Sequence, residues 1–293
     1  MFKKTVRIWK QTIQEWQEDQ APRFSAALAF YSTFSIAPLL IIIIGIAGII
    51  FGKDAAQGRL MGELGNLVGD QAAGALQEAI KSASVGGRGV WATVIGALTL
   101  LIGATSVFGE MQTDLNTMWN VKPKPGKAGL WGFLRSRIFS FGLIIAIGFL
   151  LLVSLTVSAS LTAFSNFLGQ YIPGQELLLQ IANIVVGLVV VTVLFALIYK
   201  YLPDAKIKWR DVWPGAFLTA ILFTVGRVLI GLYIGHSAVG SSFGAAGSLV
   251  ILLLWVYYSA QILFLGAEYT QVRASIKGAG VKPASYAETK KAA

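Results

Sequence analysis

Arg227 is the first candidate for a functional residue because it interrupts a long apolar stretch. Residues 212–235 contain no other Asp, Glu, Lys, Arg or His. Placing a charge in the hydrocarbon of a bilayer costs at least about 2.5–3.5 kcal/mol on insertion scales, so such a residue predicts a functional site. The functional reading of Arg227 is an anion-binding group that lines a cavity. The alternatives are a buried structural partner and an arginine that snorkels to the outer surface.

A glycine- and serine-rich segment, residues 236–248, follows Arg227 and carries no acidic or basic side chain except His236. Irregular backbone is tolerated at membrane depth only where it is buried in protein or lines a cavity. If the next helix starts partway into the bilayer, its free N–H groups would favour an anion beside Arg227. The alternative is a flexible outer hairpin. The candidate substrate-binding residues are Arg227, His236, Ser241, Ser242 and Gly244.

Three carboxylates and one proline are candidates for gating or structural roles. Glu110 and Glu268 come at the ends of apolar stretches, and Asp114 follows Glu110 by one helical turn. These acids would either pair with basic loops or gate a cavity. Pro38 lies within the first apolar stretch, where it frees a backbone carbonyl and permits a kink. A kink is a possible hinge, although prolines are also common in membrane helices for packing alone.

The composition excludes several classes of enzyme chemistry. There are no cysteines and only one histidine, which rules out thiolate nucleophiles, Cys-ligated metals and multi-histidine metal sites. The chain has no HExxH motif. A two-carboxylate site formed by Glu110 and Asp114 would lie at the membrane edge and is the weakest alternative. We therefore expect no enzyme activity, no metal and no cofactor.

Six apolar stretches predict an all-α polytopic membrane protein. Only 13% of the 293 residues are charged, about half the usual share in a soluble domain. A membrane-spanning helix needs roughly 20 apolar residues. The sequence predicts six such helices, at about residues 24–51, 90–109, 138–164, 177–199, 212–235 and 245–267.

The distribution of basic residues predicts the orientation of these helices. Nineteen Lys and Arg residues flank them on one side, and four lie on the other, all within residues 52–89. The positive-inside rule then places both termini in the cytoplasm of a bacterium, with the protein in its inner membrane. This asymmetry also accounts for the net charge of +10 without nucleic acid as a partner.

Three further segments complete the predicted organisation. Phe2, Val6, Trp9, Ile13 and Trp16 form an apolar stripe beside basic residues, which predicts either a helix in the cytoplasmic interface or a helix packed on the protein itself. Residues 52–89 predict an extracytoplasmic insertion of two short amphipathic helices. Leu60, Leu64 and Leu67 share one face of the first, and Leu76, Ile80 and Ala83 share one face of the second. Residues 1–275 form one domain, and we expect residues 276–293 to be a disordered cytoplasmic tail.

Several short motifs together resemble a known family. They are Ala27-Leu28-Ala29-Phe30-Tyr31 with Pro38, Asp114-Leu115-Asn116 with Trp119, Leu202-Pro203, residues 209–216 (WRDVWPGA), residues 252–258 (LLLWVYY) and Gly266-Ala267-Glu268. In this order and spacing the chain resembles the YihY / virulence factor BrkB family of inner-membrane proteins over about residues 20–275. The resemblance implies a bacterial membrane protein suspected of transport or export. The family's old ribonuclease label does not fit a chain with one histidine.

Two functions fit this reading. The first is a transporter, exporter or lipid-handling protein with an anion-favouring cavity near Arg227, whose substrate would be an anionic lipid or an organic anion. The second is a non-transporting scaffold that organises partner proteins and keeps Arg227 paired inside a closed core. Membrane lipids are partners in either case. The substrate, the energy coupling and the oligomeric state are not encoded in any motif of this chain.

Overall fold

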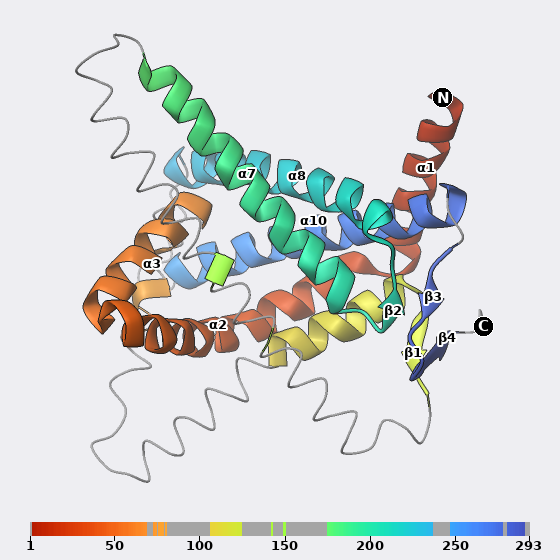
Figure 1. The fold of residues 1–293 in the computed structure, drawn as a ribbon, viewed down its shortest axis with the longest axis horizontal. Coiled ribbons are helices and arrows are strands. Elements are labelled where there is room, and N and C mark those ends of the chain that lie inside the picture. The colour runs from red at the N-terminus through yellow and green to blue at the C-terminus, as the bar shows by residue number, and fades with distance from the viewer. Residues whose placement is uncertain are drawn as a thin grey trace.

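The computed structural model describes residues 2–68, 73–74, 76–78, 80, 106–124, 142, 149–150, 175–236, 247–277 and 280–290. These residues are mainly helical (Figure 1). The helices are α1 (Phe2–Glu18), α2 (Ala21–Phe51), α3 (Lys53–Val68), a segment at 106–118, α7 (Gln175–Tyr201), α8 (Trp209–His236) and α10 (Gly247–Lys277).

Three of the described helices are long and apolar enough to cross a membrane. They are Ile181–Tyr201, Trp209–Ile230 and Val250–Lys277, and they coincide with the last three predicted spans. α2 is helical through position 38 and covers the first predicted span. The predicted spans at 90–109 and 138–164 lie almost wholly outside the described residues, so six crossings and their orientation stay predictions.

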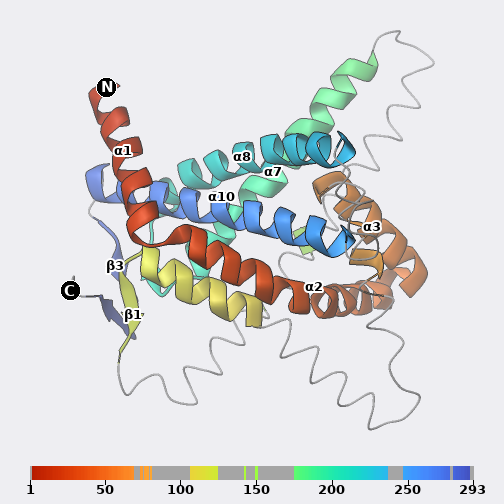
Figure 2. The same ribbon diagram turned by 180° about the vertical axis from the view of Figure 1, so that it is seen from behind.

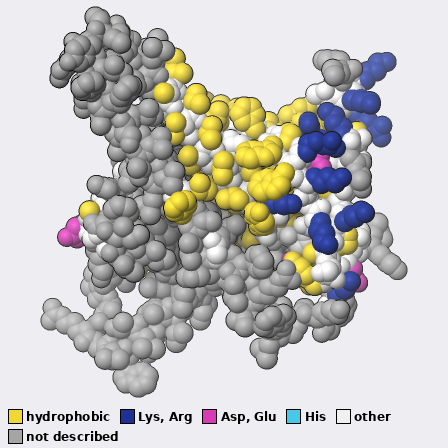
Figure 3. Space-filling view, in the orientation of Figure 1, with side chains coloured by type: hydrophobic (Ala, Val, Ile, Leu, Met, Phe, Trp, Pro, Cys, Tyr) yellow, Lys and Arg dark blue, Asp and Glu magenta, His cyan; other side chains and the backbone are white. Residues whose placement is uncertain are grey.

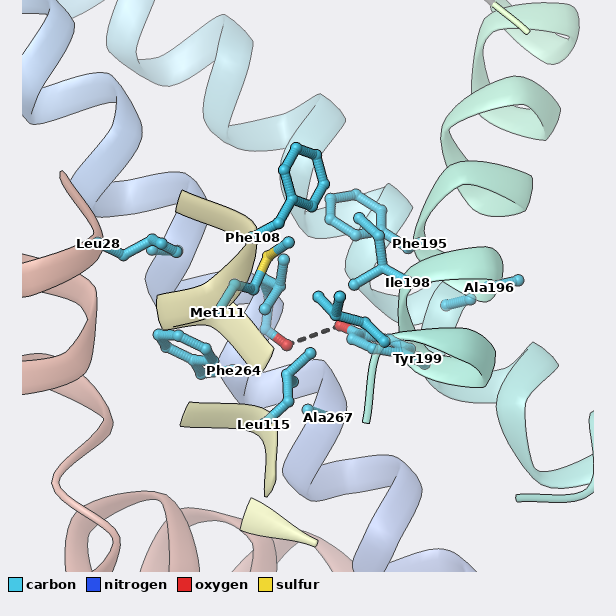
Figure 4. Packing of buried hydrophobic residues seen from close by; sticks show 14 of the residues in the cluster. Leu28, Phe108, Met111, Leu115, Phe195, Ala196, Ile198, Tyr199, Phe264 and Ala267 are labelled. Carbon is cyan, nitrogen blue, oxygen red and sulfur yellow. Dashed lines mark hydrogen bonds between the residues drawn. The ribbon is translucent and has the colours of Figure 1, made fainter. Parts of the chain in front are cut away.

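α10 is the central helix of the assembly. It packs against both α2 and α8, and α7 crosses α8 obliquely (Figures 1 and 2). Buried side chains from several helices meet beside it, including Leu115, Tyr199, Phe264 and Ala267 (Figure 4). The outer faces of α7 and α8 instead expose aliphatic and aromatic side chains (Figure 3). An apolar surface of this extent is typical of a face that contacts lipid.

Two short antiparallel sheets close the end of the molecule where Lys and Arg gather (Figure 3), called the basic end below. β1 (Val121–Pro123) pairs with β4 (Ala287–Thr289), and β2 (Ala205–Lys206) pairs with β3 (Lys282–Pro283). Residues 280–290, the C-terminal strap, therefore hold two loops that are far apart in sequence. The prediction of a disordered tail is wrong for these residues, because their backbone groups complete both sheets.

α1 lies across the basic end, at a large angle to α10 (Figures 1 and 2). Ile8 and Thr12 are buried, and Trp9 contacts Tyr269 of α10 with the ring centroids 5.3 Å apart. Val6 and Ile13, on another face, are 51% and 48% exposed. The helix thus packs on the protein through one face and leaves part of the predicted apolar stripe uncovered.

α3 follows α2 after a single residue, Gly52, whose φ of 81° is a backbone conformation that favours glycine. The helix confirms the first of the two predicted in 52–89, and residues 73–74, 76–78 and 80 are also helical. Leu60, Leu76 and Ile80 are buried together in the main core. The side of the membrane on which this insertion lies stays a prediction.

Candidate functional site: the α7–α8–α10 interface and its basic end

Arg227 lies on the inward-facing row of α8. The buried and partly buried residues of this helix recur at helical spacing through Ala216, Ala220, Phe223, Arg227 and Ile230. The opposite face carries the exposed Phe217, Ile221, Val225, Val228, Leu229 and Leu232. Arg227 itself is partly buried, so its position matches a residue directed toward the neighbouring helices more closely than one facing lipid. Within the described residues no side chain forms an ion pair or hydrogen bond with it.

Residues next to Arg227 on α8 pack against aromatic side chains of α10. A Cβ on Gly226 would come within 1.9 Å of the Tyr258 ring, so only glycine lets α10 approach α8 this closely. One turn earlier on α8, Phe223 contacts Trp255 with the ring centroids 4.7 Å apart. Trp255 is buried, and its indole N–H has no acceptor among the described residues.

The other predicted members of the anion site lie at the end of α8 or outside the described residues. His236 is the last residue of α8. Ser241, Ser242 and Gly244 lie outside the described residues, and α10 is described from Gly247. At position 38 the structure shows continuous helix, and the Pro38 side chain is not described. The grouping of these residues around Arg227 therefore stays a prediction.

Two more glycines bring α8 and α10 into close contact farther toward the basic end. A Cβ on Gly215 would lie 1.7 Å from Thr270 Oγ1, and a Cβ on Gly266 would lie 1.8 Å from Thr219 Oγ1. The glycines and threonines thus interlock reciprocally across the interface. Small residues of this kind are what allow membrane helices to pack backbone against backbone.

A small network of buried hydrogen bonds joins α7 to this interface (Figure 4). The Tyr199 hydroxyl donates to the Leu263 carbonyl at 2.7 Å. It lies 2.8 Å from Thr219 Oγ1, which also lies 2.8 Å from the Gly215 carbonyl. The two hydroxyl protons serve three contacts, so one of the hydroxyl groups shares its proton between two acceptors. One polar cluster therefore connects all three helices.

Glu268 lies near two other acids, Asp19 and Glu15. It is fully buried, and neither carboxyl oxygen has a hydrogen-bond partner of regular geometry among the described residues. Burial raises the pKa of Asp19, in the α1–α2 turn, while its contact with Glu268 and the charge of Lys290 lower it. Burial likewise raises the pKa of Glu15. The predicted ion pairs of Glu110, Asp114 and Glu268 do not occur among the described residues, where the one ion pair is Lys122–Glu288.

Asp114 is a buried carboxyl on segment 106–118, beyond the predicted span that ends at residue 109. It is 2% exposed and Oδ2 has no partner among the described residues. Burial, with a smaller contribution from the charge of Glu110, raises its pKa to about 7. Glu110, one turn away, is partly buried.

This raised pKa predicts that stability falls as the pH rises toward neutrality. The unfolded chain ionises Asp114 near pH 4, whereas the folded chain holds the proton up to about pH 7. Stability is therefore fully present below about pH 4 and is lost toward pH 7, by up to about 1.4 kcal/mol per pH unit. Asp114→Asn should flatten this dependence in melting curves of the detergent-solubilised protein. Asp54→Asn, which removes an exposed carboxyl, should keep the wild-type profile; parallel profiles for wild type and Asp114→Asn would contradict the assignment.

Asp204 is the centre of a second polar network that the sequence did not single out. Its carboxylate accepts hydrogen bonds from Asn116 Nδ2 at 2.9 Å and Gln112 Nε2 at 3.1 Å. Its backbone N–H donates to Asn116 Oδ1 at 2.7 Å, and its carbonyl accepts from Ala284 of the strap. The sequence does contain a signal for this network. An acid follows Leu202-Pro203 directly in an otherwise basic loop, and such a residue, once buried, needs a hydrogen-bond partner elsewhere in the chain.

Comparison with known proteins decides the family. The family model for virulence factor BrkB matches residues 12–290, which is nearly the whole chain. The chain belongs to the BrkB family. This membership confirms the resemblance inferred from the motifs along the helices.

The chain is also similar to UPF0761 membrane proteins of several organisms. The chain is 26% identical to a UPF0761 membrane protein of Azotobacter vinelandii over 91% of its own length and 63% of the relative's. It is 27% identical to one of Pseudoalteromonas atlantica over 90% of each chain, and 28% identical to one of Verminephrobacter eiseniae, of which it covers 62%. The chain thus spans less than two thirds of some relatives. No solved structure matches it. Together with the apolar helices, these relatives identify a membrane protein.

Proposed function

We propose that this protein is a transporter, exporter or lipid-handling protein of the bacterial inner membrane, with a site near Arg227 that favours an anionic substrate. The observation that carries the proposal is the position of Arg227 on the inward row of a membrane helix, beside the glycine contact with Tyr258. A charge in this position is costly unless it is compensated, and a substrate anion would compensate it. His236, Ser241, Ser242 and Gly244 would complete the site. The protein itself acts without enzyme chemistry or a cofactor.

The proposed topology has both termini in the cytoplasm. The basic end, which carries the strap and α1, is then cytoplasmic, as the positive-inside rule requires. α1 supports this arrangement because it lies across the end of the bundle, with Val6 and Ile13 uncovered beside Lys3, Lys4, Arg7 and Lys10. In the cytoplasmic interface its apolar face would enter the headgroup region. Glu110, Asp114 and Glu268 then lie near the cytoplasmic end, where they would gate or brace the helices.

Flux measurements with purified protein in proteoliposomes test the proposal. We expect wild-type protein to move labelled anionic phospholipid or an organic anion, and Arg227→Ala to lower that rate at least tenfold, since loss of one charged contact to a substrate costs about 1.5–3 kcal/mol. Arg227→Lys should retain part of the activity because it keeps the charge. The substrates should be assayed in parallel, with a zwitterionic lipid as the reference.

Lys277→Ala is the matched control, because it removes an exposed basic side chain from the last turn of α10 and no binding role is proposed for it. It should leave the flux within about twofold of wild type. Equal rates for wild type and Arg227→Ala with every substrate would remove the anion site from the proposal. Absence of any flux by wild type would favour the second candidate function.

The second candidate function is a scaffold that organises partner proteins without transport. The specific observation in its favour is the basic end, where the strap pairs with two loops and Asp204 is tied to Asn116 and Ala284. A basic end held by these strand pairings and hydrogen bonds would give partner proteins a rigid surface to bind. A scaffold would keep partner binding in the Arg227→Ala variant, whereas a transporter would lose flux.

A further inference from the structure

Three aromatic side chains form an exposed ledge where α7 ends and α8 begins. Tyr201 contacts Trp209 edge-on, with the ring centroids 6.0 Å apart, and Trp209 stacks on Trp213 at 5.9 Å. The three residues, called the aromatic ledge below, are 50%, 39% and 44% exposed. Large rings that are in mutual contact and yet this open are unfavourable in water but are favoured at a membrane–water interface.

The local backbone holds the ledge in place. The loop between α7 and α8 is anchored by the Asp204 network and by the pairing of β2 with β3. The Lys200 ammonium donates to the Ile207 carbonyl and lies 5.8 Å from the centre of the Trp209 ring. A cation at this distance is attracted to the face of an indole. The ledge is therefore a preformed surface with its outer side uncovered.

The outward row of α8 changes character with distance from the basic end. Trp209, Trp213, Phe217, Ile221 and Val225 follow one another at a spacing of four residues, and all are exposed. The row thus passes from amphipathic indoles to purely apolar side chains within a few turns. This order matches the passage from headgroups to acyl chains in one leaflet, so a lipid chain can lie along Phe217 and Ile221.

Among the described residues of the loop and the first turn of α8, the charges exposed beside the ledge are basic. Lys206, Lys208 and Arg210 are exposed, whereas the two acids of this region, Asp204 and Asp211, are 7% and 8% exposed. Asp204 is in addition occupied by Asn116 and Gln112. The positive potential beside the rings is therefore not neutralised by a neighbouring carboxylate on the surface, which favours a negatively charged headgroup over a zwitterionic one.

We infer that the aromatic ledge, with Lys208 and Arg210, binds an anionic phospholipid of the adjacent leaflet. The lipid phosphate contacts the two basic side chains, the glycerol region lies against the indoles, and an acyl chain follows Phe217 and Ile221. The site is on the outside of α8 and is separate from Arg227, so it does not depend on the proposed transport function. Arg227→Ala should leave lipid binding at the ledge unchanged.

Bromine quenching of tryptophan fluorescence tests this inference. The full chain is placed in phosphatidylcholine nanodiscs that contain increasing fractions of brominated phosphatidylglycerol or, at the same fractions, brominated phosphatidylcholine. We expect phosphatidylglycerol to quench the ledge emission, taken as the difference between wild type and Trp213→Phe, at a lower lipid fraction than phosphatidylcholine. Lys208→Gln/Arg210→Gln should raise the phosphatidylglycerol fraction that gives half-quenching by about tenfold or more.

Lys3→Gln/Lys4→Gln is the matched control, because it removes the same charge from α1, a helix that packs on α10 and α2. It should shift the half-quenching fraction less than threefold. Equal quenching of the wild type by the two brominated lipids would overturn the inference without reliance on any variant. It would also be overturned by an unchanged phosphatidylglycerol dependence in Lys208→Gln/Arg210→Gln, or by loss of the phosphatidylglycerol effect in excess inorganic phosphate.

Discussion

Gly266→Ala should lower the stability of the protein strongly, although it adds only one methyl group. The added Cβ would lie 1.8 Å from Thr219 Oγ1 and 2.5 Å from the Tyr199 hydroxyl, and both of those side chains are fully buried. Neither side chain can move away without breaking the hydrogen-bond network that it forms or separating α8 from α10. Overpacking of this kind costs about 1–3 kcal/mol or more. We expect a fall in melting temperature of about 5–10 °C in detergent.

Gly187→Ala provides the matched control for this experiment. Gly187 lies within α7, and a Cβ there would meet no atom within 4 Å, so the substitution should be neutral or slightly stabilising. Thr219→Ala removes one of the two clashes and should make Gly266→Ala less harmful in the double variant than in the single one. Equal melting temperatures for Gly266→Ala and Gly187→Ala would show that the α8–α10 contact is looser than described.

Asn116→Ala should be the most damaging polar substitution at the basic end. Asn116 accepts from the Asp204 N–H at 2.7 Å and donates to its carboxylate at 2.9 Å, and both residues are 7% exposed. Alanine would leave a buried carboxylate oxygen and a buried N–H without their partner. Hydrogen bonds to charged groups contribute about 1.5–3 kcal/mol each, so we expect a loss of about 2–4 kcal/mol in the free energy of unfolding.

A double-mutant cycle with Asp204→Ala measures the coupling directly. The double variant should be less unstable than the sum of the single variants by about 1–3 kcal/mol, as for residues that share one network. Thr113→Ala, an exposed position on the same segment, should change stability by less than about 0.5 kcal/mol. Additive effects of Asn116→Ala and Asp204→Ala would mean that the two side chains do not act together.

The long helices of α7, α8 and α10 could be predicted from the sequence because hydrophobic length is itself the signal. Twenty apolar residues have one stable conformation in a bilayer, and no partner needs to be known. The same reasoning recognised Arg227, whose charge stands out against its neighbours, and the structure places it on the inward row of α8. Whether Arg227 faces a substrate is a property of side chains that local pattern does not encode.

The basic end was predicted poorly because its contacts join residues far apart in the chain. Residues 280–290 look like a polar tail until their partners in β1 and β2 are known, and each strand is only two or three residues long. For Glu268 the sequence predicted either a pair with a basic loop or a gating role, and the acids near it, Asp19 and Glu15, come from α1 and its turn. Asp204 gained its role from Asn116, and no spacing rule links these two positions. Tertiary pairing, not propensity, decided each case.

The strap has a consequence for the order of events during biosynthesis. The Lys124 ammonium donates a hydrogen bond to the carbonyl of Ser285, which lies 161 residues later in the chain. At a translation rate of about 5–20 residues per second, β1 waits about 8–30 s for its partner strand to be made. During that interval the edge of Val121–Pro123 is unpaired, and Asp204 lacks its contact with Ala284. The nascent protein therefore passes through a stage in which β1 and the loop after α7 have been made while the basic end is still open.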